Sequence, residues 1–312
     1  MDRPPSLRPP SAGDPRPAPP PAPAPLQELH ALDHLWFQVG GTLCNIECSH
    51  CFISCGPRNH AFGMMSLEQV ETLLAESEAL GVKEYYFTGG EPFLNRELVP
   101  ILEATLRRGP ATVLTNATLL PERTLLDLRR LDDASPYSLE IRVSIDGASP
   151  ATNDPIRGQG TFERAMQGVR GLVRHGFLPI ITAMMADGAS EGFEEFCAAL
   201  RAAGYERPRL KLIPPLRIGR EAARSRGYLR QERVSAEMMQ GYDDSSLLCS
   251  HSRTASDRGV HVCPILLESP AARLGSTLGE AQRPFPLAEA ACYSCYLYGA
   301  ICSNSSAAPR PA

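Results

Sequence analysis

Three cysteines near the start of the folded chain have the spacing of a metal-binding loop. Cys44, Cys48 and Cys51 are separated by three and then two residues, which lets one loop present three thiolates to a single centre. Iron–sulfur clusters are held by Cys thiolates, and a [4Fe-4S] cluster with only three protein ligands leaves one iron open to a small molecule. A structural zinc knot with His50 or Cys55 as its fourth ligand remains the alternative. The loop therefore predicts a metal centre, and an open iron would make it catalytic.

A second group of cysteines lies near the C-terminus and contains five of the ten cysteines of the chain. A distant pair, Cys249 and Cys263, precedes a close pair, Cys292 and Cys295, and Cys302 follows. Four thiols suffice for a closed site, and Cys302 is set aside because its spacing lies outside the close pair. The first four cysteines are the predicted ligands, and a four-cysteine zinc staple stays open because both metals accept thiolates.

Composition narrows the class of protein. The 312 residues carry a formal charge of −4, without a basic footprint of the kind that binds phosphate backbones, so no nucleic-acid partner is expected. No run approaches eighteen apolar residues, so no membrane span is expected. Residues 1–30 are rich in Pro and Ala, lack the apolar core of a signal peptide, and predict a disordered tail. Cysteines without a secretory context indicate a reducing cytoplasm.

From residue 31 onward, short β-branched or aromatic runs alternate with amphipathic stretches. Six strands are predicted, over His34–Val39, Glu84–Thr88, Thr112–Thr115, Leu139–Ile145, Pro179–Met184 and Arg209–Ile213. Helices are predicted over Ser66–Leu80, Arg96–Arg108, Pro121–Leu131, Phe162–His175 and Phe193–Ala203. Six β/α repeats predict an α/β fold, a partial (β/α)6 TIM-like barrel over residues 31–240, with a doubly wound sheet as the runner-up. Residues 241–312 are turn-rich and predict a small cysteine-rich C-terminal module.

Polar residues follow several of these strands, where chemistry belongs in such folds. Gly89 and Gly90 let backbone carbonyls approach a ligand, and Glu91 offers a charge-assisted partner for an ammonium group. Ser144 and Arg157 offer a hydroxyl and a guanidinium, two groups that can bind a carboxylate. Structural roles remain open for each: a surface Glu, a strand-end hydroxyl and a loop arginine.

The cysteine loop and the strand ends together resemble the radical S-adenosylmethionine superfamily, over about residues 35–215. The segments that carry the resemblance are the Cys-x3-Cys-x2-Cys loop, Gly89-Gly90-Glu91-Pro92, Thr115-Asn116-Ala117, Ser144-Ile145-Asp146-Gly147, and Asn153 to Phe162. Ala117 stands where the family has Gly, and Asn153 where it has His. The resemblance implies that Asn116 contacts cofactor or substrate, although Asn is also a common turn former. Asp146 is expected to shape its turn rather than touch a ligand.

In detail, the chain is similar to the branch with C-terminal SPASM or twitch modules. The twitch form implies one auxiliary [4Fe-4S] cluster held by Cys249, Cys263, Cys292 and Cys295. In that pattern four residues separate the glycine from the second cysteine, whereas three separate Gly259 from Cys263. Five C-terminal cysteines are too few for the two clusters of a full SPASM module.

The resemblance also implies the reaction class and the partners. A reduced cluster cleaves S-adenosyl-L-methionine to a 5′-deoxyadenosyl radical that abstracts hydrogen from the substrate, with electrons from a reductant such as flavodoxin or ferredoxin. The substrate stays open between a peptide and a small molecule. A non-catalytic, metal-stabilised binding protein is the competing class, and it predicts metal without cofactor cleavage.

Overall fold

The computed structural model describes residues 23–184 and 192–299. Its main sheet has nine strands in the order β10-β9-β8-β2-β3-β4-β5-β6-β7. The six strands from β2 to β7 are parallel and follow the chain in order, and their bounds are β2 His34–Phe37, β3 Glu84–Phe87, β4 Ala111–Thr115, β5 Leu139–Ser144, β6 Ile180–Met184 and β7 Arg209–Ile213. The predicted partial (β/α)6 barrel is confirmed, and the doubly wound alternative is wrong because neighbouring strands follow one another without reversal of order.

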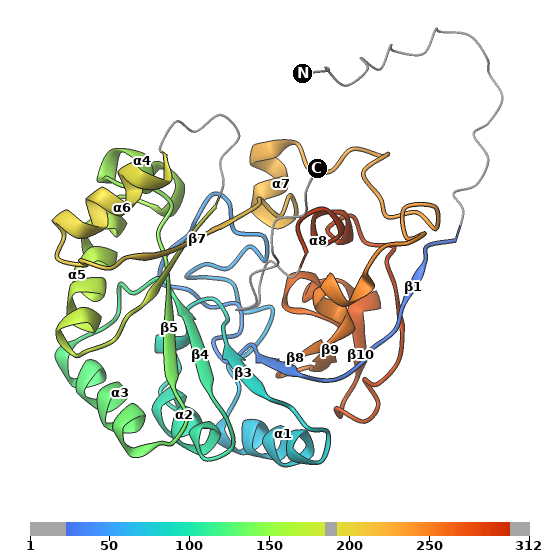
Figure 1. Cartoon of the computed structure of the whole chain (residues 1–312), viewed down its shortest axis with the longest axis horizontal. Coiled ribbons are helices and arrows are strands. Elements are labelled where there is room, and N and C mark those ends of the chain that lie inside the picture. The colour runs from blue at the N-terminus through green and yellow to red at the C-terminus, as the bar shows by residue number, and fades with distance from the viewer. Residues whose placement is uncertain (1–22, 185–191, 300–312) are drawn as a thin grey trace, which may run out of the picture.

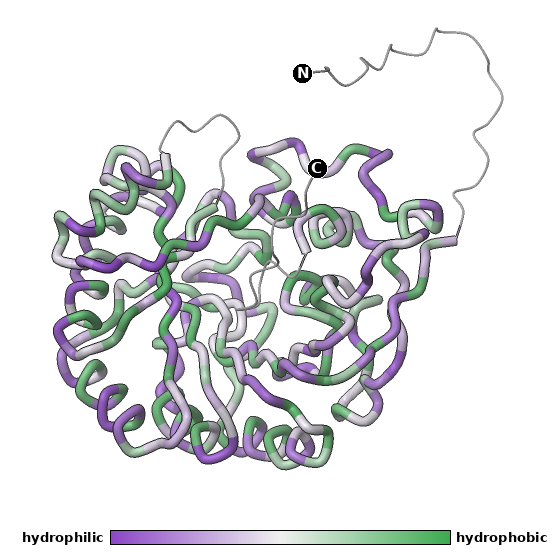
Figure 2. Tube along the Cα trace, in the orientation of Figure 1, coloured by the Kyte–Doolittle hydropathy of each residue, from purple (hydrophilic) through white to green (hydrophobic). Residues whose placement is uncertain are grey.

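A helix follows each of the six strands, and most of these helices lie around the outside of the barrel (Figure 1). Their bounds are α1 Leu67–Ala79, α2 Leu98–Leu106, α3 Glu122–Ala134, α4 Pro150–Arg157, α5 Thr161–Arg174, α6 Phe193–Ala202 and α7 Gly219–Ser225. Figure 2 shows hydrophilic and hydrophobic residues alternating along these helices, as amphipathic helices require. In α1, for example, Val70 and Leu74 are fully buried.

Local signals in the sequence explain where the helices begin and end. Ser66 forms a capping box with Gln69 at the start of α1, and Gly81, at φ 73°, follows its end. Ser149 and Thr152 form a second capping box that starts α4. Helices α4 and α7 were not predicted, because Pro155 in α4 and the brevity of α7 hide the helical period.

The C-terminal region continues the barrel sheet. Strand β8 (Ser252–Ser256) pairs in parallel with β2, and β9 (Gly259–His261) and β10 (Arg273–Gly275) follow in antiparallel order. Helix α8 (Cys292–Tyr298) lies beside these strands (Figure 1). The cysteine-rich segment is therefore joined to the first barrel strand by main-chain hydrogen bonds.

The described N-terminal residues also contact the C-terminal region. Strand β1 (Leu26–Gln27) pairs with β11 (Phe285–Pro286), and Gln27 is buried. The disordered tail predicted over residues 1–30 is thus wrong at its C-terminal end, because a Pro-rich segment can still supply an edge strand. The rest of that prediction, over residues 1–22, lies outside the described residues. In the described part of the chain, no helix is long and apolar enough to cross a bilayer.

Candidate functional site

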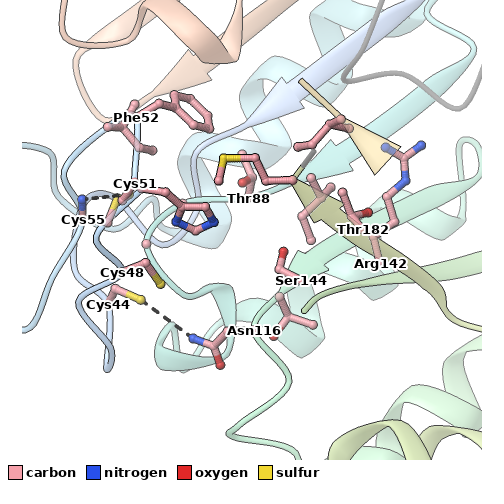
Figure 3. A pocket seen from close by; sticks show the side chains of 18 of the residues that line it. Cys44, Cys48, Cys51, Phe52, Cys55, Thr88, Asn116, Arg142, Ser144 and Thr182 are labelled. Carbon is pink, nitrogen blue, oxygen red and sulfur yellow. Dashed lines mark hydrogen bonds between the residues drawn. The ribbon is translucent and has the colours of Figure 1, made fainter. Parts of the chain in front are cut away.

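The cysteine loop between β2 and α1 folds back on itself and faces a cavity of about 220 Å³. Cys44 N donates to Gly56 O at 3.1 Å and Gly56 N donates to Thr42 O at 3.2 Å, which closes the loop. Cys44, Cys48 and Cys51 all line the cavity (Figure 3). The structure therefore brings the three predicted thiols to one opening.

Cys55 is a fourth thiol on this cavity, beside Cys51 (Figure 3). The Cys55 backbone N–H donates to Cys51 Sγ at 3.3 Å. A hydrogen bond from the Cys55 thiol, together with backbone donors, lowers the pKa of Cys51, whereas burial raises the pKa of Cys44 to about 12. Cys55 thus favours a negative charge on Cys51 without belonging to the three-cysteine motif.

Two glycines after β3 allow that strand end to approach the cysteine loop. Gly90 N donates to Gly41 O at 2.9 Å, and a Cβ atom on Gly90 would lie 2.0 Å from Leu43 O. A Cβ atom on Gly89, which has φ 149°, would lie 2.6 Å from Gly40 Cα. Both glycines line the cavity. The glycines expected to admit a ligand are therefore also required by close packing against the loop that carries Cys44.

Glu91 is not among the residues that line the cavity, and its contact with a ligand stays a prediction. Its side chain is fully buried, Oε1 accepts from Thr115 Oγ1 at 2.7 Å and Phe93 N at 3.2 Å, and Oε2 accepts from Asn116 N at 2.8 Å. Burial raises the pKa of Glu91 to about 7, although these three donors oppose the rise. Glu91 therefore holds the end of β4 against the end of β3.

Asn116, directly after β4, links the end of that strand to Cys44. Its Nδ2 donates to Asn45 Oδ1 at 2.9 Å and lies 3.8 Å from Cys44 Sγ (Figure 3). The next residue, Ala117, has φ 55°, a conformation that favours glycine. The backbone at Ala117 thus has the conformation expected of the glycine that occupies this position in the family.

Ser144 and Arg157 both line the cavity, as predicted for the carboxylate ligands. Arg157 Nε lies 2.6 Å from Asp146 Oδ2, and His50 Nε2 lies 2.7 Å from the same oxygen. Asp146 Oδ1 accepts from Met184 N at 2.7 Å. Although burial opposes ionisation, Arg157 and His50 hold the pKa of Asp146 well below its usual range. Asp146 therefore organises the strand ends, and it fixes the guanidinium of Arg157 at the cavity.

Arg220, in α7, is a functional residue that the motifs did not identify. Its Nε donates to Cys48 O at 2.7 Å, its Nη1 donates to Ser54 O at 2.9 Å, and its Nη2 contacts Cys55 O. The concentration of arginines from residue 217 to 233 was visible in the sequence, but nothing there connects it to a loop 170 residues earlier. Arg220 binds the carbonyls that hold the cysteine loop in shape.

The four predicted C-terminal cysteines line a second, much smaller cavity of about 20 Å³. Cys249, Cys263, Cys292 and Cys295 share it with apolar residues of the same region, and its described lining contains no carboxylate. Burial raises the pKa of Cys249 to about 12 and of Cys263 to about 11. Cys302 lies outside the described residues. Cys197 is 2% exposed on α6, away from both cavities, as expected of a core residue.

Within residues 23–184 and 192–299, no three His, Cys, Asp or Glu side chains are grouped closely enough to hold a single metal ion. The thiols of each site converge on a cavity rather than on one point.

The fold and the residues around the cavity define a class of protein. Comparison with known families gives that class its name. The model of the radical SAM superfamily matches residues 39–203. This chain belongs to the radical SAM superfamily. The family uses a [4Fe-4S] cluster and S-adenosylmethionine, and the cysteine loop carries three thiols of the kind that bind such a cluster.

Among curated proteins, the chain is similar to the mycofactocin maturase MftC of Mycobacterium tuberculosis, at 29% identity over 135 residues, 43% of this chain and 33% of that protein. It is also similar to GTP 3′,8-cyclase of Klebsiella pneumoniae, at 29% identity over 161 residues, 50% of this chain and 48% of that protein. The chain thus matches a third to a half of the length of these relatives.

Among solved structures, SuiB of Streptococcus suis bound to S-adenosylmethionine superposes with a TM-score of 0.59 at 16% identity, covering 78% of this chain and 63% of that one. anSMEcpe with bound AdoMet and a Cp18Cys peptide superposes with a TM-score of 0.58 at 17% identity, covering 79% of each chain. At these identities the similarity establishes the fold.

Proposed function

We propose that Cys44, Cys48 and Cys51 hold the catalytic [4Fe-4S] cluster of this enzyme, with one iron open to S-adenosylmethionine. The observation that carries the proposal is that the three thiols of the motif open on a single cavity, where Cys55, the fourth thiol of the loop, is a hydrogen-bond partner of Cys51. When bound there, the reduced cluster supplies the electron that splits the cofactor and so starts hydrogen abstraction from the substrate.

The residues around the cavity bind and orient the cofactor. Ser144 and Arg157 bind its carboxylate, and the carbonyls of Gly89 and Gly90 accept from its ammonium group. Asn116 keeps Cys44 in place through its contact with the sulfur. Asp146 and Glu91 position other residues, since their carboxylate oxygens already bind protein groups. Burial of these polar groups strengthens their electrostatic interactions with a charged cofactor.

The C-terminal module, residues 241–312, is proposed to hold an auxiliary [4Fe-4S] cluster on Cys249, Cys263, Cys292 and Cys295. The support is that residues up to 46 positions apart in the chain line one cavity. Parallel pairing of β8 with β2 joins this module to the strand that precedes the catalytic loop. A structural zinc is the alternative, because four thiolates also bind zinc.

The substrate is proposed to be a peptide. The printed names of relatives include a mycofactocin maturase and structures with a precursor peptide or a Cp18Cys peptide bound. A small molecule is the second candidate, supported by the likeness to GTP 3′,8-cyclase. Electrons are proposed to come from a flavodoxin or a ferredoxin.

One anaerobic experiment tests the core of the proposal. Protein reconstituted with iron and sulfide is reduced and given S-adenosylmethionine, and 5′-deoxyadenosine is measured. Formation of 5′-deoxyadenosine is expected. A protein that binds metal but produces none under these conditions would belong to the competing class of metal-stabilised binding proteins.

A further inference from the structure

The segment from residue 217 to 233, which we call the arginine segment, lies against the cysteine loop. It consists of α7 and the turn that follows this helix. Arg220 N donates to Cys51 O at 3.0 Å, and Arg220 Nε donates to Cys48 O at 2.7 Å. A Cβ atom on Gly219 would lie only 2.3 Å from Phe52 O, so α7 begins in close contact with the same loop.

The turn after α7 reaches the second cysteine site. Tyr228 Oη lies 2.7 Å from Ser294 Oγ, and Ser294 stands between Cys292 and Cys295 in α8. Figure 1 shows α7 beside α8 accordingly. The arginine segment therefore contacts both groups of thiols, and a protein docked on it would lie next to the cysteine loop.

Arg217 folds the arginine segment back on itself. Its guanidinium lies over the Tyr228 ring, 4.5 Å from the centroid, and its Nη1 donates to Gly227 O at 3.3 Å. Arg217 also pairs with Glu232, which accepts from Leu229 N at 2.6 Å. These contacts make the turn after α7 a compact structure that is fixed against the beginning of the helix.

The arginine segment is strongly positive in a chain that is negative overall. It contains six arginines and two glutamates, whereas the 312 residues carry a formal charge of −4. The two glutamates are used within the segment, because Glu232 pairs with Arg217 and Glu221 pairs with Arg224 at 2.7 Å. In the part of the chain that the structure describes, no ion pair involves the three other exposed arginines of the segment, which are Arg226, Arg230 and Arg233.

An exposed apolar side chain lies among these arginines. Leu229 is 56% exposed and precedes Arg230 directly. Protein interfaces combine apolar contacts with arginines, and a positive surface attracts an acidic partner and orients it. An acidic peptide would satisfy the charge alone. The contacts of the segment with both groups of thiols favour a partner that delivers electrons, because such a partner must approach an iron–sulfur centre.

We propose that the arginine segment docks an acidic one-electron carrier protein that reduces the cluster held by Cys44, Cys48 and Cys51. This inference rests on the proposed function and gives its electron donor a place on the chain. In the step itself, the reduced carrier loses one electron and the oxidised cluster gains it. No covalent bond between the two proteins forms or breaks.

Two sets of charge reversals test the surface. The triple variant Arg226→Glu, Arg230→Glu and Arg233→Glu reverses the proposed docking charges. Its control reverses three exposed arginines on α3 and α5, which lie away from α7 in Figure 1, and consists of Arg123→Glu, Arg130→Glu and Arg170→Glu. A triple Arg→Gln variant at residues 226, 230 and 233 removes the same charges without adding new ones.

The probe is flavodoxin, a small acidic flavoprotein, and the enzyme is reconstituted and contains S-adenosylmethionine. Calorimetry measures binding of oxidised flavodoxin, and 5′-deoxyadenosine formation is compared between photoreduced flavodoxin and dithionite. The docking variant should bind flavodoxin at least tenfold more weakly, the Arg→Gln variant should show a smaller loss, and the control should show none. Added salt should weaken binding to the wild type several-fold and to the docking variant much less. Activity with dithionite, which needs no docking surface, should be equal in all four proteins.

Equal flavodoxin affinities in the docking and control variants would overturn the inference. Loss of dithionite-driven activity as large as the loss with flavodoxin would do the same, because the arginines would then act through the fold. If the docking variant loses affinity for a poly-glutamate peptide but not for flavodoxin, the surface binds acidic peptides and the carrier assignment is wrong. Wild-type enzyme that forms 5′-deoxyadenosine with dithionite but neither binds nor accepts electrons from flavodoxin or ferredoxin contradicts only this inference. Absence of 5′-deoxyadenosine with dithionite contradicts the proposed function itself.

Discussion

The two cysteine sites of this chain differ in the space and the charge around their thiols. The first site, Cys44, Cys48 and Cys51, opens on a cavity of about 220 Å³ lined by polar strand ends. The second, Cys249, Cys263, Cys292 and Cys295, surrounds about 20 Å³ among apolar side chains. The larger cavity leaves room for a ligand beside a metal centre, whereas the smaller one leaves room for little besides the metal centre.

The arginines beside the two sites differ in how their positive charge is compensated. At the first site, Arg157 is matched by the buried carboxylate of Asp146. At the second, Arg253 is 1% exposed and donates only to carbonyls, those of Cys249, Ser252, Ala281 and Arg283. The first site can thus hold its charges without a metal, but the second contains a buried cation whose counter-charge would come from metal-bound thiolates.

The largest expected effect separates the sites by function. Replacing Cys44, Cys48 and Cys51 together by Ala should abolish 5′-deoxyadenosine formation, because the open iron disappears. The wild-type chain should contain close to eight irons, and this variant about four, as two four-iron clusters require. Undiminished cofactor cleavage would show that the first site is assigned wrongly. If the variant contains one zinc and no iron, the second site is a structural staple.

The reciprocal change should affect stability more than chemistry. Cys263→Ala with Cys292→Ala should remove about half of the iron and lower the melting temperature, since bound metal contributes directly to folding of small turn-rich segments. Cofactor cleavage should persist. Cys197→Ala, a buried thiol outside both sites, is the control that should keep all the iron. Loss of cleavage together with full iron content would contradict the separation of roles.

Much of the first site was predictable from the sequence, because its residues follow strands in a regular β/α order. The predicted strand Arg209–Ile213 matches β7 in both bounds, and the other five differ from the structure by one or two residues at one end. The carboxyl ends of parallel strands meet at one edge, so placing Asn116 and Ser144 near the cysteine loop required only the strand assignments.

The remaining features depend on tertiary contacts that have no local signal. Nothing in the sequence around Glu91 shows that Thr115 and Asn116 occupy its carboxylate. Nothing around Arg220 connects it with the carbonyl of Cys48. The pairing of β8 with β2 joins segments more than 200 residues apart, so the attachment of the second site to the barrel also appears only in the structure.

Arg157→Ala should weaken S-adenosylmethionine binding by a factor of roughly ten to a hundred, because a buried charge-assisted hydrogen bond contributes about 1.5–3 kcal/mol. It also leaves Asp146 buried with only His50 as its charged partner, which should destabilise the fold by about 3–5 kcal/mol. Calorimetric binding and chemical unfolding measure the two effects. Arg164→Ala, at an exposed position of α5, is the control. An unchanged affinity would give Arg157 a purely structural role.

Glu91 should give the barrel a pH dependence. Because burial raises its pKa in the folded chain to about 7, above the ordinary value of 4.5, its favourable contribution is complete below pH 4.5 and is lost between pH 4.5 and 7. The loss should be on the order of 3 kcal/mol. Chemical unfolding of the cluster-free chain across this range should therefore show a decline that Glu91→Gln removes. A decline of equal size in the variant would assign it to other groups.

The smallest expected effect concerns the potential of the second centre. The buried guanidinium of Arg253 stabilises the more negative, reduced state of a metal–thiolate centre, and burial already lowers the pKa of Arg253 to about 10 in the chain without metal. Arg253→Met should therefore lower the reduction potential of the second cluster by on the order of 50 mV, close to tenfold in the redox equilibrium, while the first cluster keeps its potential. Arg253→Lys keeps the charge and should restore most of the shift, and Arg283→Met, at an exposed position of the same region, should change neither potential. Equal shifts in both clusters would mean that Arg253 acts through the fold rather than through its charge. Two unchanged potentials would mean that its charge is balanced by something other than the thiolates.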